Sequence, residues 1–103
     1  MITTYKIITA TETEYSLEKG TILSHTRTRT VSLARNIAMC IARDLTDLSY
    51  PELGKEFQRH HTSVVSAVKR VDKLLLTDLQ VARSVEHIIS AVKPVGFFRR
   101  LFK

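Results

Sequence analysis

The sequence predicts an all-α protein, a compact helical bundle that contains a helix-turn-helix. Three segments carry apolar residues at the spacing of an amphipathic helix, over residues 31–45, 62–75 and 78–92. A shorter helix is predicted over residues 49–57, and only a few residues separate it from its neighbours. Short links between helices favour a compact bundle, and 103 residues are enough for one domain.

The first helix of the predicted helix-turn-helix has a strong start signal. Ser49 is a favourable N-cap, and Glu52 stands three residues later, at the spacing of a capping box. Pro51 falls in the first turn, where its missing N–H costs nothing. Leu53 and Phe57 then form an apolar stripe. We therefore expect a short helix over residues 49–57.

The second helix of the motif begins at His61 or Thr62, after the polar run 58–61 interrupts the apolar pattern. Its expected buried positions are Val64, Ala67, Val68, Val71 and Leu75. Its opposite face starts with small polar residues and continues with basic residues: Ser63, Ser66, Lys69, Arg70 and Lys73. A second helix of this kind is typical of a DNA-binding helix-turn-helix.

Two further helices complete the predicted bundle. The helix over residues 31–45 carries an apolar stripe, and Ser32 is a candidate N-cap. That stripe consists of Ala34, Ile37, Ala38, Ile41, Ala42 and Leu45. Thr77 is the candidate N-cap of the last helix, with Gln80 at capping-box spacing. The expected buried face of this last helix is Val81, Val85, Ile88, Ile89 and Val92.

The N-terminal third has weaker patterns. Residues 1–14 read either as an extended lead-in or as a helix that reaches towards Tyr15, and Gly20 is expected to end a short helical turn. The polar, basic stretch 25–30 follows. It is either a solvated linker or a basic arm that enters a DNA groove or contacts phosphates.

Composition narrows the classes of function. A net charge of +6 favours nucleic acid as a partner, then an anionic membrane, although a solvated basic surface without a partner would have the same charge. The single cysteine, Cys40, excludes an internal disulfide and is expected to be a buried thiol. Neither a signal peptide nor a long apolar run is present, so we expect a cytoplasmic, nucleoid-associated protein.

The sequence lacks the patterns that point to catalysis or cofactors. A phosphate-binding glycine loop and a Cys/His zinc pattern are both missing. His60 and His61 are adjacent, so on a helix their side chains diverge by about 100° and form a poor metal pair. We therefore expect no enzyme activity, no cofactor and no small-molecule substrate.

The C-terminal segment 94–103 combines aromatic and basic residues. Phe97, Phe98, Leu101 and Phe102 alternate with Arg99, Arg100 and Lys103. Such a segment can bind a membrane surface or a partner protein, although we favour the simpler interpretation that its aromatic residues pack on the core or that it is disordered. We expect no membrane anchoring and keep a protein partner at Phe97–Lys103 as an alternative.

The centre of the chain resembles a known family. The runs RTRTVSLARNIAMCIARDLTDLSYPELGKEF and HHTSVVSAVKRV are similar to the C-terminal DNA-binding domain of the bacterial replication initiator DnaA. The resemblance covers residues 15–92 and implies a Trp-repressor-like helix-turn-helix that binds duplex DNA at the family's DnaA box. It divides the chain into a lead-in (1–14), a DNA-binding domain (15–93) and a tail (94–103). The family's ATPase module is missing, so we expect a free-standing small protein or a fragment.

The resemblance implies DNA contacts in the basic stretch and in the long helix after it. Arg27 matches an arginine that enters the minor groove, and Arg29 is implied to contact the backbone. Arg35 and Asn36 match a pair that binds phosphates at the start of the long helix.

The resemblance also implies contacts in the helix-turn-helix. Tyr50 and Pro51 match a helix start that lies against the DNA backbone. His61, Thr62 and Ser63 match a run that reads bases and phosphates in the major groove. The remaining expected DNA-binding residues of the motif are Arg59, His60, Val65, Ser66, Lys69 and Arg70.

Two departures from the family pattern concern the turn. The family has two glycines there, whereas residues 58–61 are one residue shorter and contain no glycine. His60 replaces an aspartate that can accept from a cytosine amino group. His60 either accepts or donates a hydrogen bond to DNA or is a turn residue without base contact, and the target sequence can differ accordingly.

From the sequence we therefore expect sequence-specific binding of double-stranded DNA at DnaA-box-like sites. The protein would regulate replication or transcription without ATPase activity. The alternative is an adaptor that acts through the aromatic and basic tail at residues 97–103.

Overall fold

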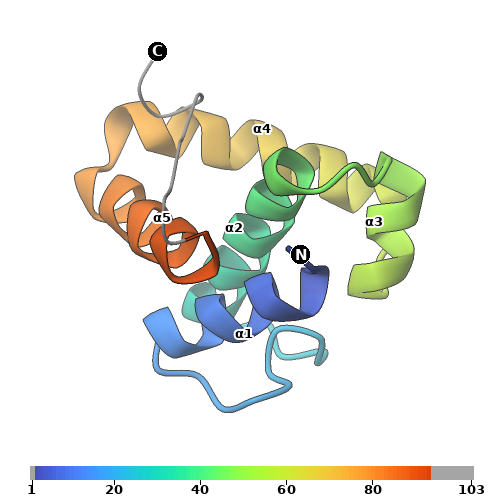
Figure 1. Cartoon of the computed structure of the whole chain (residues 1–103), viewed down its shortest axis with the longest axis horizontal. Helices are drawn as coiled ribbons and strands as arrows, with labels where there is room; N and C mark the ends of the chain where they lie inside the picture. The colour runs from blue at the N-terminus through green and yellow to red at the C-terminus, as the bar shows by residue number, and fades with distance from the viewer. Residues whose placement is uncertain (1, 94–103) are drawn as a thin grey trace.

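The chain folds around one long central helix. The computed structural model describes residues 2–93, and within them it contains α1 (Thr4–Glu14), α2 (Arg29–Leu45), α3 (Tyr50–Phe57), α4 (His61–Thr77) and α5 (Leu79–Val92) (Figure 1). Helix α2 contacts each of the other four helices. The described residues form no strand, so the predicted all-α fold is confirmed. None of the described helices could span a membrane.

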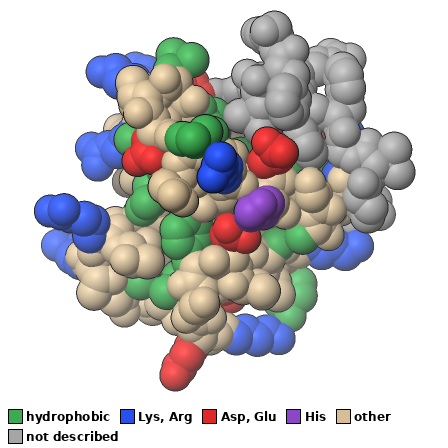
Figure 2. Space-filling model, turned by 90° about the vertical axis from the view of Figure 1, so that its left-hand side faces the viewer, with side chains coloured by type: hydrophobic (Ala, Val, Ile, Leu, Met, Phe, Trp, Pro, Cys, Tyr) green, Lys and Arg blue, Asp and Glu red, His purple; other side chains and the backbone are tan. Residues whose placement is uncertain are grey.

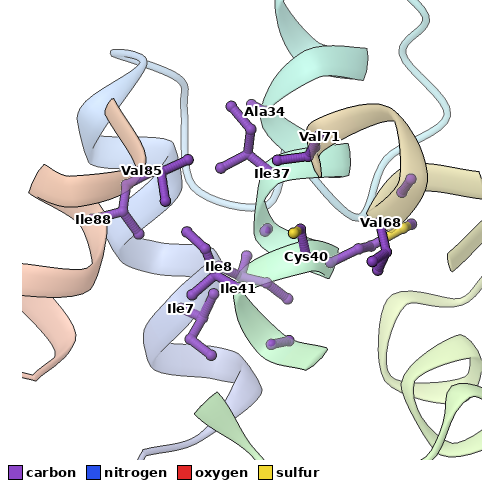
Figure 3. Packing of buried hydrophobic residues seen from close by; sticks show 14 of the residues in the cluster. Ile7, Ile8, Ala34, Ile37, Cys40, Ile41, Val68, Val71, Val85 and Ile88 are labelled. Atoms are coloured by element: carbon purple, nitrogen blue, oxygen red, sulfur yellow. The ribbon is translucent and has the colours of Figure 1, made fainter. Parts of the chain in front are cut away.

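Small side chains let the other helices approach α2 closely. Ala34, Ala38 and Ala42 are completely buried along its length, and Ile37 and Ile41 fill the space between them. Figure 3 shows Ala34, Ile37 and Ile41 of α2 among core residues of the other helices: Ile7 and Ile8 of α1, Val68 and Val71 of α4, and Val85 and Ile88 of α5. Met39 and Cys40 are buried too, so α2 is covered on more sides than its predicted stripe indicated. The prediction of a buried Cys40 thiol is confirmed.

The predicted start of α3 is confirmed. The Ser49 hydroxyl accepts from the Glu52 backbone N–H (3.3 Å), and the Glu52 carboxylate accepts from the Ser49 N–H (2.8 Å), which makes a complete capping box. Pro51 lies in the first turn, as expected. The two hydrogen bonds between Ser49 and Glu52 therefore fix where the helix-turn-helix begins.

The predicted N-caps of α2 and α5 are wrong. Thr28 rather than Ser32 caps α2, because its hydroxyl accepts from the Val31 N–H (3.3 Å). Asp78 rather than Thr77 caps α5, because its carboxylate accepts from two backbone N–H groups of the first turn. A carboxylate is the stronger cap, since it also carries a charge that the helix dipole favours.

The N-terminal segment forms a helix rather than an extended lead-in. Thr3 caps α1 by accepting from the Lys6 N–H (3.2 Å), and Ile7 and Ile8 enter the core. Helix α1 runs antiparallel to α5 (Figure 1), and Glu14 lies 3.3 Å from His87 across the pair. Gly20 does not end a helical turn as expected but lies in a loop turn with φ +94°.

The helix-turn-helix depends on a close approach of backbone at Gly54. Helix α3 ends at Phe57, and its C-cap Gln58 adopts the left-handed conformation (φ 56°). The Arg59 N–H then donates back to the Gly54 carbonyl (2.8 Å). A Cβ on Gly54 would lie 2.7 Å from the Arg59 carbonyl oxygen and 3.1 Å from the His61 nitrogen. The turn itself has no glycine, but α3 has Gly54 at the position where the backbone of Arg59 and His61 packs against the helix.

We predict that Gly54→Ala destabilises the protein by about 1–3 kcal/mol, because the methyl group overlaps backbone atoms that cannot rotate away. Urea denaturation followed by circular dichroism measures this change. Ser90→Ala, at an exposed position of α5, is the control and should stay within about 0.5 kcal/mol of the wild type. Equal stability of Gly54→Ala and wild type would contradict the close approach.

We also predict a pH-dependent contribution from the capping box. Hydrogen bonds from the Ser49 backbone and side chain lower the pKa of Glu52 below its ordinary value of 4.5. Because the folded-state pKa is lowered, the charged carboxylate stabilises the fold above pH 4.5, and this contribution is lost as the pH falls through the lowered pKa. Glu52→Gln should therefore be less stable than wild type at neutral pH, and the two urea curves should converge at acidic pH. An equal difference at both pH values would contradict this.

Candidate nucleic-acid interface

Helix α4 separates a buried face from a polar outer face. Val64, Ala67, Val68 and Val71 are buried, as predicted. Most of the α4 residues that the sequence assigned to DNA are exposed: His61, Thr62, Ser63, Ser66, Lys69 and Arg70. Val65, implied for contact with a thymine methyl group, is half-buried on one flank. The exposed face therefore begins with an imidazole and hydroxyl groups at the helix N-terminus, and the basic side chains of Lys69 and Arg70 follow.

A polar hollow of about 240 Å³ lies beside this face, between α2 and α4. It is lined by Asn36, Thr62, Ser63, Ser66, Ala67 and Arg70. The hollow brings Asn36 of α2 together with four of the predicted DNA-binding residues of α4. One guanidinium, one carboxamide and three hydroxyls give it the hydrogen-bonding groups that suit a phosphate or the polar edge of a base.

The loop before α2 is held from below by Arg35. Its Nε donates to the Ile22 carbonyl (2.7 Å), and its Nη2 donates to the carbonyls of Ser24 (3.0 Å) and Thr26 (3.1 Å). Only 8% of Arg35 is exposed. The structure therefore gives Arg35 a positioning role beneath the loop, and its phosphate contact stays a prediction. Its fork-shaped guanidinium suits this role because it can bond three alternate carbonyls at once.

Arg59 joins the same loop to the turn of the helix-turn-helix. Its Nη2 donates to the Ser24 carbonyl (2.7 Å), and its Nη1 donates to the Gln58 carbonyl (3.1 Å) in its own turn. The Ser24 carbonyl thus accepts from both Arg35 and Arg59. Burial, followed by the nearby charge of Arg59, lowers the pKa of Arg35. Both guanidiniums remain charged at neutral pH, so they add positive potential beneath the loop.

A buried carboxylate fixes the other end of the loop. Glu12 of α1 is only 3% exposed, and its Oε2 accepts from the backbone N–H groups of Gly20 (2.9 Å) and Ile22 (3.1 Å). Glu12 was not among the predicted site residues, because nothing in an acidic, threonine-rich stretch marks one carboxylate as buried. Carbonyls bonded to arginines and N–H groups bonded to Glu12 together explain how a polar segment without hydrophobic periodicity holds one conformation.

The two remaining arginines of the basic stretch face outward. Arg27 is exposed in the loop that Arg35 and Arg59 hold. Arg29 is exposed as well, but it lies in the first turn of α2 because Thr28 caps the helix. The prediction of a loop over residues 25–30 was therefore two residues too long.

Tyr50 and Pro51 lie at the N-terminus of α3. Pro51 is exposed, and the Tyr50 ring lies beneath the Arg43 guanidinium of α2, with 4.9 Å between the guanidinium carbon and the ring centroid. Arg43, which was not among the predicted site residues, therefore fixes the orientation of Tyr50. The sequence gave no signal of this contact, because Arg43 and Tyr50 lie on different helices.

The turn ends at His60, which is the N-cap of α4, and the helix begins at His61. Both histidines are exposed, and their ring centroids are 4.5 Å apart.

The opposite end of the molecule has a different surface. Figure 2 shows the side where α4 passes into α5, and on its described part acidic, basic and hydrophobic side chains are interspersed.

These features define a helix-turn-helix protein with its polar helix face, basic loop and turn joined into one unit. Residues 4–71 match the family described as the bacterial DnaA protein helix-turn-helix. The chain therefore belongs to this family. The match begins at the first residue of α1, earlier than the expected start at Tyr15, and ends inside α4. The family's helix-turn-helix is a DNA-binding domain rather than a catalytic one.

The interaction expected at Phe97–Lys103 lies outside the described residues.

We predict that Arg35→Lys loosens the basic loop although it keeps the charge. A lysine ammonium is a single point of attachment and cannot bond three alternate carbonyls, so the backbone amides of residues 24–28 should exchange with deuterium faster and stability should fall by about 1–3 kcal/mol. Arg43→Lys, at an exposed position of the same helix, is the matched control and should leave loop exchange unchanged. Unaltered exchange in Arg35→Lys would show that the three carbonyl bonds do not order the loop.

Proposed function

We propose that this protein binds double-stranded DNA at DnaA-box-like sites, with α4 in the major groove and Arg27 in the adjacent minor groove. It would act as a regulator of replication or transcription at the nucleoid, without ATPase activity of its own. The observation that carries this proposal is the double acceptance at the Ser24 carbonyl. Through it, Arg35 and Arg59 connect the loop that carries Arg27 to the turn that positions α4.

A rigid link between these two elements matters because DNA fixes the separation of its grooves. A recognition helix and a minor-groove arm can contact one site together only if the protein holds them at a matching separation. Preorganisation also lowers the entropy lost on binding, since the loop is ordered before DNA arrives. The contacts of Arg35, Arg59 and Glu12 supply that order.

The chemistry of α4 suits the major groove. The N-terminus of the helix carries positive potential, which favours a phosphate. Thr62, Ser63 and Ser66 have short hydroxyl side chains that can donate to or accept from base edges. Lys69 and Arg70 follow on the exposed part of the helix and would contact the phosphate backbone.

The chemistry of Arg27 suits the minor groove. Its guanidinium is weakly hydrated and loses less on leaving water than a lysine ammonium would. A narrow minor groove concentrates negative potential, so it attracts an inserted arginine. Arg29, exposed two residues later at the start of α2, would contact the backbone beside it.

We predict that fluorescence anisotropy at about 150 mM salt will show the wild type binding a DnaA-box duplex roughly 10³-fold more tightly than a scrambled duplex. Arg27→Ala should weaken specific binding by about 1–3 kcal/mol. Arg83→Ala, at an exposed position of α5, removes the same charge and should have little effect.

Salt dependence provides the second arm of this measurement. If about 6–10 phosphates are contacted, affinity should fall by about 10³–10⁵ between 50 and 200 mM salt. An affinity that does not change with salt concentration would contradict the proposal. Unchanged function in Arg27→Ala, together with loss on deletion of residues 97–103, would favour the adaptor alternative.

A further inference from the structure

His60 has an unusual task for a histidine, because it caps the recognition helix. Its backbone is extended (φ −66°, ψ 147°), and its ring Nδ1 accepts from the Thr62 backbone N–H (3.3 Å). The same Nδ1 lies 2.9 Å from the Thr62 hydroxyl oxygen. The ring also packs on His61, with 4.5 Å between centroids and 32° between planes. The backbone cap and the neighbouring ring together fix how the His60 imidazole is presented.

The cap determines where the His60 proton lies. A backbone N–H can only donate, so Nδ1 must present its lone pair. In a neutral imidazole the proton is then on Nε2, on the far side of the ring from the cap. A Thr62 hydroxyl that bonds to the unprotonated Nδ1 has to donate to it, which leaves its own oxygen lone pairs as acceptors. In the neutral form of the ring, the backbone cap therefore makes Nε2 of the exposed His60 side chain a donor.

We propose that His60 is a specificity-determining residue that donates from Nε2–H to an acceptor on a base edge. Guanine is the preferred base, since its N7 and O6 are neighbouring acceptors in the major groove. Cytosine is disfavoured, since it presents an amino donor there. This inference rests on the proposed function, because it requires the N-terminus of α4 to enter the major groove.

Asparagine and aspartate have nearly the same shape as each other, so substituting each for His60 distinguishes its role as a helix cap from its role as a hydrogen-bond donor. Asparagine and aspartate are both strong N-caps, so His60→Asn and His60→Asp should each preserve the start of α4. The asparagine amide caps with its oxygen and presents an NH₂ donor outward. The aspartate carboxylate caps with one oxygen and presents only an acceptor outward. A preference due to the donor therefore survives in His60→Asn and changes in His60→Asp.

The experiment selects bound duplexes from a random pool with the full chain as wild type, His60→Asn and His60→Asp. Fluorescence anisotropy then measures the affinity of each protein for duplexes that differ only at the base pair whose selected identity depends on residue 60. We expect wild type and His60→Asn to prefer guanine at that position, and His60→Asp to prefer cytosine or adenine. The guanine-to-cytosine affinity ratio should fall at least roughly tenfold in His60→Asp. Ratios are compared because the added negative charge weakens binding to every duplex.

His60→Ser guards against misfolded variants. Serine caps a helix but its side chain is too short to reach a base from this position, so this variant should lose the preference without acquiring a new one. The same base preference in all four proteins would overturn the inference and leave DNA binding intact. A guanine preference lost in His60→Asn would also overturn it. If the wild type binds no duplex specifically, both the inference and the proposed function fail.

Discussion

The arrangement of the candidate interface depends on one backbone carbonyl, that of Ser24. It accepts hydrogen bonds from Arg35 on α2 and from Arg59 in the turn between α3 and α4. Two cations that share one carbonyl repel each other, so this arrangement needs the surrounding carbonyls that each guanidinium also bonds. The outcome is a basic loop whose position is tied to the helix-turn-helix rather than a linker that moves independently of it.

The second constraint is space between backbones. Helix α2 can lie at the centre because three of its core positions are alanine, and α3 can meet the start of α4 because Gly54 has no side chain. Packing at both places is set by backbone contact, which leaves little freedom to slide. The outer face of α4 is therefore held at a defined angle to α2, where Asn36 completes the polar hollow. The described residues thus present a preassembled polar surface to any ligand that fits it.

Much of the fold could be predicted, because its signals are local. The apolar spacing of residues 64–71 and the Ser49–Glu52 box each act within one or two helical turns, and both predictions are confirmed. The errors lay where two caps competed: Thr28 prevailed over Ser32, and Asp78 over Thr77. Such choices depend on how the preceding loop arrives at the helix, which the spacing of residues does not reveal. Met39 was likewise missed as a core residue because its burial depends on a neighbouring helix.

The candidate site divides in the same way. By itself the sequence determined the last four helices, the polar face of α4 and the exposed basic residues that belong to it, because each follows from signals along one segment. It left α1 open between a helix and an extended lead-in. Only the tertiary structure decided that Arg35 supports the loop, that Glu12 is buried, and that Arg59 reaches Ser24, 35 residues away in the chain. The physical reason is that backbone carbonyls and N–H groups are present at every residue. A sequence therefore cannot show which of them a distant side chain will bond, and folding decides it by bringing particular groups within reach.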